Sequence, residues 1–282
     1  MALPSRPRSE APEHACLVVI SGPEIGRRVP LSEGDLVIGR AGEADLLIDS
    51  DGVSRIHAVI ARLPHGFVLR DQDSTNGTFV NDQPIRERTL RDGDQIRIGV
   101  AMLKFLTSDN VEAQYHEEIY RLMTIDGLTQ IYNRRHFEET LEREFARSRR
   151  YRSPFTLVLL DIDHFKLIND ERGHPAGDEV LRRIGALLKS KIRTNDLAAR
   201  IGGEEFALTL PGTNLAGGVA LAEKLRGLVA GERFWHDGKP FQVTASFGVA
   251  EFTLTMVGAD SLIKLADEHL YEAKRGGRNR VC

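Results

Sequence analysis

The chain has 282 residues, a formal net charge of −3 at neutral pH, 41% hydrophobic and 28% charged residues. This composition excludes collagen-like and low-complexity chains, and we expect no nucleic-acid partner because no broad basic field is present. Cys16 and Cys282 lie near opposite ends and form no CxxC pair, which argues against a disulfide framework or zinc site. No apolar run approaches the roughly 18–20 residues of a membrane helix, so we expect a cytoplasmic protein with no membrane span.

The first half of the chain carries the pattern of an all-β domain. Residues 1–14 are rich in Pro and Arg and are predicted to form a flexible N-terminal tail. Residues 15–108 contain short β-branched runs separated by turn signals, which predicts an all-β sandwich. The expected strands are 14–20, 35–38, 45–48, 56–62, 67–70, 95–98 and 101–106.

Residues 109–124 are predicted to form a short amphipathic helix that joins two domains. Val111, Tyr115, Ile119 and Leu122 recur at three- to four-residue spacing, as in a helix with one apolar face. Two interpretations stay open, because so short a stripe suits either a dimer seam or a linker packed on a neighbouring domain.

From residue 125 to 282, strand patterns alternate with helix patterns, which predicts an α/β (α+β) domain. The expected helices are Arg134–Arg150, Gly177–Ile192, Leu215–Ala230 and Asp260–Arg275, and the expected strands are Phe155–Ile162, Leu197–Ile201, Glu205–Leu210 and Gln242–Glu251.

Acidic residues follow two of these strands. The buried run 155–162 leads into Asp161 and Asp163, which share a face while the chain stays extended. Glu204 and Glu205 follow Gly202-Gly203, a two-residue hairpin signal in which both glycines can take a positive φ. If the hairpin pairs beside the first strand, the carboxylates converge, and a divalent metal ion would relieve their repulsion.

Four segments resemble the GGDEF family of diguanylate cyclases, whose domain shares its fold with nucleotidyl cyclases and polymerase palms. Residues 202–206 read GGEEF, and residues 161–178 read DIDHFKLINDERGHPAGD. Residues 126–135 (DGLTQIYNRR) resemble the opening motif of the family, and residues 271–279 (YEAKRGGRN) resemble its closing motif. A lone GGEEF would be weak, but four motifs in the family's order are specific.

The resemblance implies a Mg²⁺-dependent nucleotidyltransferase, with Mn²⁺ as a substitute, that condenses two GTP into cyclic di-GMP and two pyrophosphates. Asp161, the Ile162 carbonyl, Glu204 and Glu205 would hold the metal. Glu204 or Glu205 would act as base, and sequence alone does not separate the two roles. Lys166 would stabilise charge in the transition state.

The resemblance also places substrate and inhibitor contacts. GTP would be bound by Phe165, Lys166, Asn169, His174, Asp178, Lys274 and Arg278, with Asn169 and Asp178 reading guanine. The alternatives are that Asp178 caps a helix, that His174 has a structural role in its loop, and that Lys274 and Arg278 complement a helix C-terminus. Arg193 and Asp196 fit the RxxD inhibitory site for cyclic di-GMP, although a surface ion pair is the plain alternative.

The N-terminal half resembles the FHA (forkhead-associated) family, which binds phosphothreonine peptides. Gly39-Arg40, Ser54-Arg55-Ile56-His57 and residues 74–81 (STNGTFVN) occur in the family's order. By that resemblance Arg40, Ser54, Arg55, Thr75 and Asn76 contact the phosphopeptide, whereas His57 is structural. The alternatives are a scaffold used for packing, and a phosphorylated tail at Ser5 or Ser9 as the ligand.

Because each cyclase domain would hold one GTP, the resemblance implies a homodimer, with the FHA module and residues 109–124 as its controls. Two other functions stay open: a cyclic di-GMP sensor without turnover, and an FHA adaptor whose enzyme domain is secondary. Intact Asp161, Lys166, Glu204 and Glu205 argue against the sensor.

Overall fold

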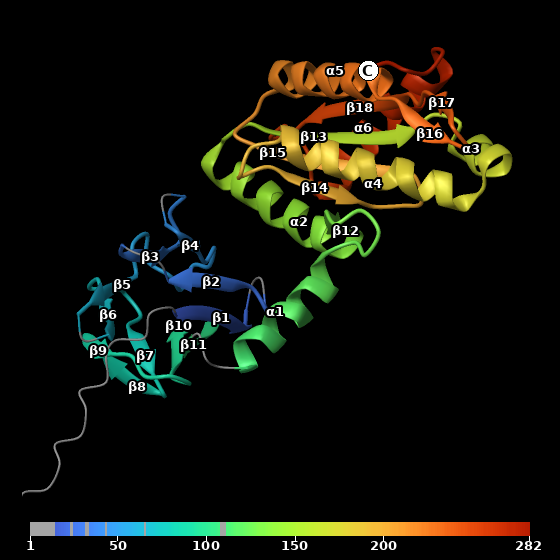
Figure 1. Cartoon of the computed structure of the whole chain (residues 1–282). Coiled ribbons are helices and arrows are strands. Elements are labelled where there is room, and N and C mark those ends of the chain that lie inside the picture. The colour runs from blue at the N-terminus through green and yellow to red at the C-terminus, as the bar shows by residue number, and fades with distance from the viewer. Residues whose placement is uncertain (1–14, 23–24, 32–33, 43, 65, 108–110) are drawn as a thin grey trace, which may run out of the picture. The chain divides into compact units, whose positions relative to one another are not determined.

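The computed structural model describes residues 15–22, 25–31, 34–42, 44–64, 66–107 and 111–282, with the backbone alone for residues 111–117. It separates into two compact units, Met1–Arg121 and Leu122–Cys282. Figure 1 shows their elements in chain order. The predicted tail at residues 1–14 lies outside the described residues.

The first unit is a sandwich of two antiparallel-rich sheets around one apolar core. One sheet has the order β2-β1-β11-β10-β7-β8 and the other has the order β4-β3-β5-β6-β9. The strands are β1 Ala15–Ser21, β2 Arg28–Leu31, β3 Leu36–Gly39, β4 Leu46–Leu47, β5 Ala58–Leu63, β6 Gly66–Asp71, β7 Thr78–Val80, β8 Gln83–Ile85, β9 Glu87–Thr89, β10 Gln95–Ile98 and β11 Ala101–Thr107. Leu17, Ile38, Leu69 and Ile96 are fully buried between the sheets, so the predicted sandwich is confirmed.

Helix α1 (Val111–Thr124) follows the sandwich in the chain. The side chains of Val111 and Tyr115, half of its predicted apolar stripe, lie outside the described residues. Of the other half, Ile119 is half-buried and Leu122 is 72% exposed. The described part of the stripe is therefore not a buried face.

The second unit is a five-stranded sheet covered by helices on both faces, which confirms the predicted α/β class. The sheet order is β12-β14-β15-β13-β18. Its elements are β12 Tyr132–Asn133, α2 Arg134–Tyr151, β13 Phe155–Ile162, α3 Phe165–Arg172, α4 His174–Lys191, β14 Leu197–Arg200, β15 Glu205–Pro211, α5 Leu215–Gly231, β16 Phe234–His236, β17 Lys239–Phe241, β18 Ala245–Glu251 and α6 Ala259–Arg275.

Strand β13 lies inside this sheet, between β15 and β18, and all eight of its residues are buried. Its alternate side chains enter two cores: Leu157 and Leu159 pack with α2 and α6, whereas Val158 and Leu160 pack with α4 and α5. A strand buried on both faces accounts for its unbroken apolar sequence.

Helix α6 lies unusually close to the sheet, because β18 offers a glycine at the crossing. A Cβ on Gly248 would overlap backbone atoms of Ala266 and Leu270. The close packing fixes α6 against β18, and the end of that helix carries Lys274. None of the helices in the described part of the chain is long and apolar enough to cross a membrane.

Candidate active site

The sheet register brings the predicted acidic residues together at the end of β13. Strands β13 and β15 are antiparallel, and Asp161 is paired directly with Glu205. The Ile162 backbone N–H donates to the carbonyl of Glu204 at 3.2 Å. The expected pairing of the GGEEF hairpin with this strand is therefore confirmed.

The hairpin tip differs from the expected two-residue turn with positive φ angles. Strands β14 and β15 pair as far as Arg200 and Phe206, and Ile201 N–H then donates to the Glu205 carbonyl at 2.9 Å. Neither Gly202 nor Gly203 has a positive φ. Gly202 instead leaves room for the Glu205 carboxylate, which a Cβ there would displace.

A lysine from α6 reaches this acidic cluster. The Lys274 ammonium lies 2.8 Å from the Asp161 carboxylate, which is largely buried at 9% side-chain exposure. A buried charge needs a partner, and Lys274 provides one. The two residues are 113 positions apart, so their contact depends on the packing of α6 against the sheet.

Two carboxylates of this cluster, those of Asp161 and Glu204, have raised pKa values. Burial raises the pKa of Asp161 above its ordinary value, and the charges of Glu205 and Asp163 add to this although Lys274 opposes it. Burial also raises the pKa of Glu204, with a further contribution from the charge of Asp161. Additional positive charge is therefore favourable at this point.

The donor chemistry fits a magnesium ion, but the carboxylates do not form a ready-made cage. Within the described residues, no group of three or more His, Cys, Asp and Glu side chains is arranged to hold a metal. The expected convergence of Asp161, Glu204 and Glu205 is thus incomplete, because Lys274 is bound to Asp161 and Glu205 folds against Gly202. Magnesium usually takes only one or two carboxylates and completes its shell with water and substrate phosphates, so an open set of oxygens suits it.

The predicted guanine readers meet where α3 packs on α4. A Cβ on Gly177 would overlap the Asn169 side-chain oxygen, so that amide lies against the first turn of α4. Asp178 is the next residue, is half-buried, and lies 4.0 Å from Arg182. The N-cap of α4 is Gly173, so the alternative that Asp178 caps the helix is wrong.

The remaining predicted GTP contacts on this segment lie in different surroundings. Lys166 is exposed on α3, whereas the Phe165 side chain is buried in the core below it. His174 is exposed and begins α4, and it is not in a loop as expected. Helix α3 was not among the expected helices, because it has eight residues and buries only Phe165, so it carries no amphipathic pattern.

The closing motif forms a tight turn after α6. Arg278 and Asn279 have left-handed φ angles of 61° and 45°. The Arg278 backbone N–H donates to the Ala273 carbonyl at 3.0 Å, and its side chain is exposed. Lys274 and Arg278 therefore lie on either side of the Gly276-Gly277 turn.

The opening motif has a structural role that the sequence did not assign. Asp126 accepts hydrogen bonds from the Thr129 N–H (2.8 Å) and hydroxyl (2.6 Å) and pairs with Arg200 at 3.4 Å. Arg200 also donates to the carbonyls of Gly202 and Gly203, at 3.1 and 2.8 Å. The motif thus holds the hairpin tip through one arginine, and the only sequence signal was an arginine two residues before GGEEF.

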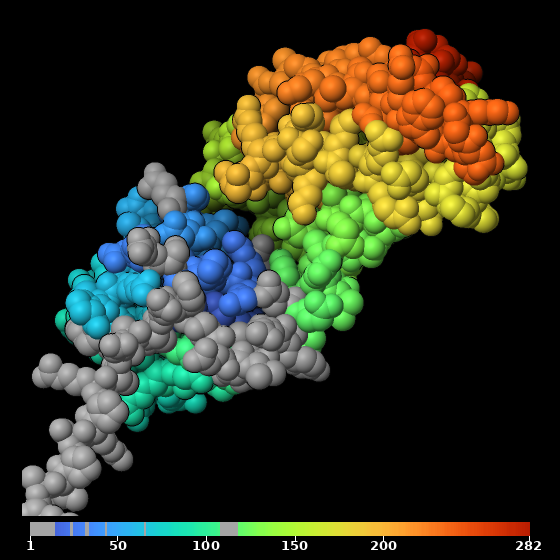
Figure 2. Space-filling model, viewed as in Figure 1, coloured from blue at the N-terminus to red at the C-terminus, as the bar shows by residue number. Residues whose placement is uncertain are grey.

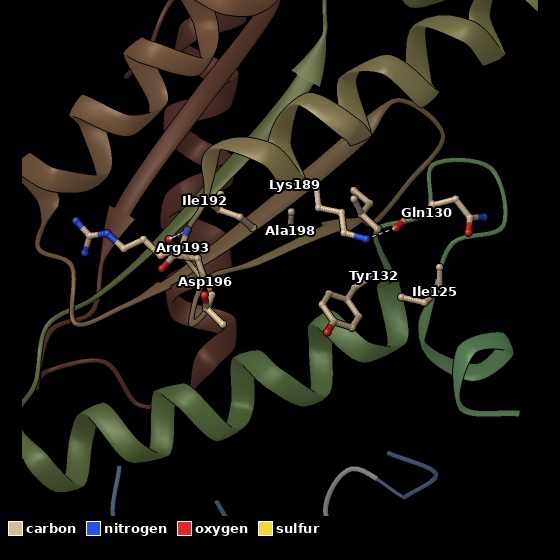
Figure 3. Close-up of a pocket in the computed structure, with 10 residues that line it drawn as sticks. Ile125, Gln130, Tyr132, Lys189, Ile192, Arg193, Asp196 and Ala198 are labelled. Carbon is tan, nitrogen blue, oxygen red and sulfur yellow. Dashed lines mark hydrogen bonds between the residues drawn. The ribbon is translucent and has the colours of Figure 1, made fainter. Parts of the chain in front are cut away.

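The RxxD residues border a cavity of about 350 Å³ in this unit. The Arg193 backbone N–H donates to the Asp196 carboxylate at 2.9 Å, while Figure 3 shows the Arg193 guanidinium extending away from it. Burial raises the pKa of Asp196, although its hydrogen bond and the charge of Arg193 oppose this. Ile125, Tyr132, Lys189 and Ile192 also line the cavity. The Arg193 guanidinium and the Asp196 carboxylate therefore do not form the surface ion pair that was the alternative to an inhibitory site.

The predicted phosphopeptide residues share one connected set of loops in the first unit. Thr75 N–H donates to the Ser54 hydroxyl at 3.1 Å, Arg40 N–H donates to the Ser54 carbonyl at 3.0 Å, and Asn76 donates to the Gly52 carbonyl at 2.9 Å. Arg55 is exposed in the same loop. The Arg40 guanidinium lies 3.5 Å from Asp51, and its Nε is buried with no hydrogen-bond partner among the described residues.

His57 joins the loop of Ser54 to the loop of Gly77 through its two ring nitrogens. It is fully buried, accepts from the Ser54 N–H at Nδ1 (3.1 Å), and its Nε2 lies 3.2 Å from the Gly77 carbonyl. The predicted structural role of His57 is confirmed.

Comparison with known proteins assigns both units. Residues 123–280 match the family model of the diguanylate cyclase GGDEF domain, and residues 36–99 match the FHA domain model. Over 156 residues the chain is 44% identical to the diguanylate cyclase DgcP of Pseudomonas aeruginosa, covering 55% of this chain and 23% of that protein. It is 37% identical to a diguanylate cyclase of Vibrio cholerae over 185 residues, or 66% of this chain and 56% of the relative.

Solved structures give the same assignment for the second unit. The coiled coil and GGDEF domain of DgcB from Caulobacter crescentus, in complex with c-di-GMP, matches 60% of this chain and 89% of that chain, with a TM-score of 0.57 and 34% identity. The active GGEEF domain of a Vibrio cholerae diguanylate cyclase matches 54% and 97%, with a TM-score of 0.52 and 37% identity. The chain spans less than two thirds of the length of the curated relatives named above.

Proposed function

Since the chain belongs to the GGDEF diguanylate cyclase family, we propose that it condenses two GTP molecules into cyclic di-GMP and two pyrophosphates. One observation carries this proposal. The register of β13 and β15 places Asp161 opposite Glu205, beside Glu204 and within 2.8 Å of Lys274. Acids that suit a metal and a cation that suits phosphate thus lie together.

Asp161, the Ile162 carbonyl, Glu204 and Glu205 would hold magnesium, with manganese as a substitute. The bound metal would neutralise negative charge on the triphosphate and lower the pKa of the attacking hydroxyl. Glu204 is the better candidate for the base that takes the proton of the 3′-hydroxyl, because its raised pKa favours proton uptake.

The cations bind and orient the triphosphate. Lys274 and Arg278 contact the terminal phosphates, and Lys166 lies exposed on α3, where it can stabilise charge that develops at the α-phosphate. In the substrate complex, Lys274 exchanges part of its contact with Asp161 for phosphate. Phe165 supports this segment from the core, so its part in GTP binding falls to its backbone.

Base selection falls to Asn169 and Asp178. The Asp178 carboxylate can accept from both N1–H and the 2-amino group of guanine, a donor pair that adenine lacks. Asn169 lies over Gly177 at the start of α4 and supplies a neighbouring amide. His174, exposed at the first position of α4, lies on the same segment and would add a further contact to GTP.

The reaction requires two copies of the chain, because one unit offers one set of GTP contacts and the product joins two nucleotides. We take residues 15–108 as the FHA module, 109–124 as the linker and 125–282 as the cyclase domain. The exposed Leu122 on α1 suits a helix that pairs with a second copy.

Two binding events would control the enzyme. Product would bind Arg193 and Asp196 as feedback inhibitor, since the free guanidinium suits a phosphate or guanine and the carboxylate accepts from guanine. A phosphothreonine peptide would bind Arg40, Ser54, Arg55, Thr75 and Asn76. The partly exposed Arg40 guanidinium supports that site, because a phosphate can replace its 3.5 Å contact with Asp51.

The test is incubation of the full chain with GTP and Mg²⁺, followed by chromatographic separation of products. We expect cyclic di-GMP from the wild type, none after EDTA treatment, and none from Glu204→Ala. Failure to form product at protein concentrations that force dimers, with GTP still bound, would reject the enzyme and favour the sensor.

A further inference from the structure

Asp163, the second acidic residue of the DID sequence, has its carboxylate bound on both oxygens. It is 5% exposed at the end of β13. Oδ1 accepts from the Ser246 hydroxyl at 2.7 Å. Oδ2 accepts from the Thr244 hydroxyl at 2.7 Å and from the Asn279 backbone N–H at 3.0 Å.

These three hydrogen bonds join parts of the chain that are far apart in the sequence. Ser246 lies in β18, Thr244 directly precedes that strand, and Asn279 belongs to the closing motif. The Asp163 N–H adds a bond to the Thr244 carbonyl at 2.9 Å. A single carboxylate therefore connects the acidic end of β13 to the C-terminal turn.

The C-terminal turn needs such support. Gly277, Arg278 and Asn279 have successive φ angles of 112°, 61° and 45°, and residues with a Cβ keep the left-handed conformation only where surrounding bonds hold them. Arg226 of α5 donates to the Asn279 side-chain oxygen at 3.0 Å. Figure 2 shows the C-terminal residues, in dark red, on the surface beside the orange segment that includes α5.

The chain on the far side of the turn is also fixed. Phe247 N–H donates to the Arg280 carbonyl, and Cys282 exchanges two hydrogen bonds with Phe247 and Val249, all at 2.9–3.0 Å. The backbone is thus held on both sides of Arg278, whose side chain stays exposed. An arginine on a fixed backbone presents its guanidinium to a phosphate with little loss of entropy.

We propose that Asp163 is a positioning residue: through the Asn279 N–H it fixes the turn that carries Arg278 and so places this cation for the GTP phosphates. This inference rests on the proposed cyclase function. A metal-binding role for Asp163, two residues after Asp161, is disfavoured because three donors already occupy its oxygens.

The distinguishing variants are Asp163→Ala and Asp163→Asn. Asparagine keeps one oxygen to accept from Thr244 and Asn279, and its amide can donate to the Ser246 hydroxyl, which also accepts hydrogen bonds. It therefore preserves the clamp while removing the charge. Alanine removes the clamp altogether.

The measurements are kcat and KM for GTP, and calorimetric binding of a non-hydrolysable GTP analogue to the full chain. We expect Asp163→Ala to raise KM and the analogue Kd by about 10- to 100-fold, with a smaller change in kcat. Asp163→Asn should stay within a few-fold of wild type. The control Glu142→Ala, at an exposed position on α2, should change neither value.

A double-mutant cycle with Arg278→Ala tests the route of the effect. If Asp163 acts through Arg278, the double variant binds no more weakly than Arg278→Ala alone. If the losses of affinity in the two single variants multiply in the double variant, the inference is overturned. It is also overturned if Asp163→Asn loses kcat as severely as Asp163→Ala, because the negative charge itself would then be required. Should Asp163→Ala fail to fold by circular dichroism, the double variant Thr244→Val/Ser246→Ala removes both hydroxyls that orient the carboxylate toward the Asn279 N–H. An unchanged analogue Kd in that variant would reject the clamp. If the wild type forms no product, the proposed function fails, and analogue binding still decides the inference.

Discussion

Asp126 shows how a single carboxylate of the opening motif supports the GGEEF hairpin through Arg200. Burial raises the pKa of Asp126, but hydrogen bonds from Thr129 and the charge of Arg200 outweigh it, so the net pKa is lowered. A group with a lowered folded pKa stabilises the fold above its unfolded pKa of 3.8, and this contribution is lost as the pH falls through the folded value.

Replacement by asparagine tests this contribution. At neutral pH, Asp126→Asn should lower the free energy of unfolding by about 1–2 kcal/mol, because a neutral amide pairs more weakly with Arg200 and Thr129. The difference from wild type should shrink as the pH falls below about 4. Urea unfolding between about pH 7 and pH 3 measures it, with Asp267→Asn as the exposed control. A difference independent of pH would show that packing, and not charge, is responsible.

At the scale of elements, Gly202 in the β14–β15 hairpin determines where the Glu205 carboxylate lies. A Cβ on Gly202 would overlap the Glu205 carboxylate, whereas a Cβ on Gly203 would meet nothing within 4 Å. Gly202→Ala should therefore displace Glu205 and lower kcat by about 10- to 100-fold. Gly203→Ala is the matched control and should stay within a few-fold of wild type, because neither glycine needs a positive φ. Equal losses in steady-state rates would mean that Cβ groups obstruct the substrate and that Glu205 is not the cause.

The elements also show what the sequence could predict. Strand β13 was predicted with its bounds because a strand buried on both faces is continuously apolar. The short edge strands β8 and β9 were missed because their residues are mostly exposed and carry no such pattern. Prediction of the site has a similar limit. The acidic residues of GGEEF and of the β13 end could be found from local spacing in the sequence. The Lys274–Asp161 and Asp163–Asn279 contacts could not, because they depend on how α6 and the C-terminal turn pack.

At the scale of the whole molecule, the chain joins an FHA domain to a GGDEF domain, and Arg40 offers a way to separate their proposed functions. The Arg40 side chain is 34% exposed, and its guanidinium lies 3.5 Å from the exposed Asp51 carboxylate. A phosphothreonine would replace that contact with charge-assisted hydrogen bonds to the exposed part of the guanidinium. Arg40→Ala should therefore weaken phosphopeptide binding by at least about tenfold, corresponding to about 1.4 kcal/mol.

Binding and activity must be measured on the same preparation, because regulation requires that peptide occupancy change the cyclase rate. We expect a phosphothreonine peptide to shift the wild-type rate and to have no such effect on Arg40→Ala at the same concentration. Arg86→Ala, an exposed arginine of the same module, should bind and respond like wild type. Peptide binding that leaves the wild-type rate unchanged would reduce the FHA module to a tether that localises the enzyme. The proposed feedback site would then remain as a candidate control, and its cavity lies entirely within the second unit.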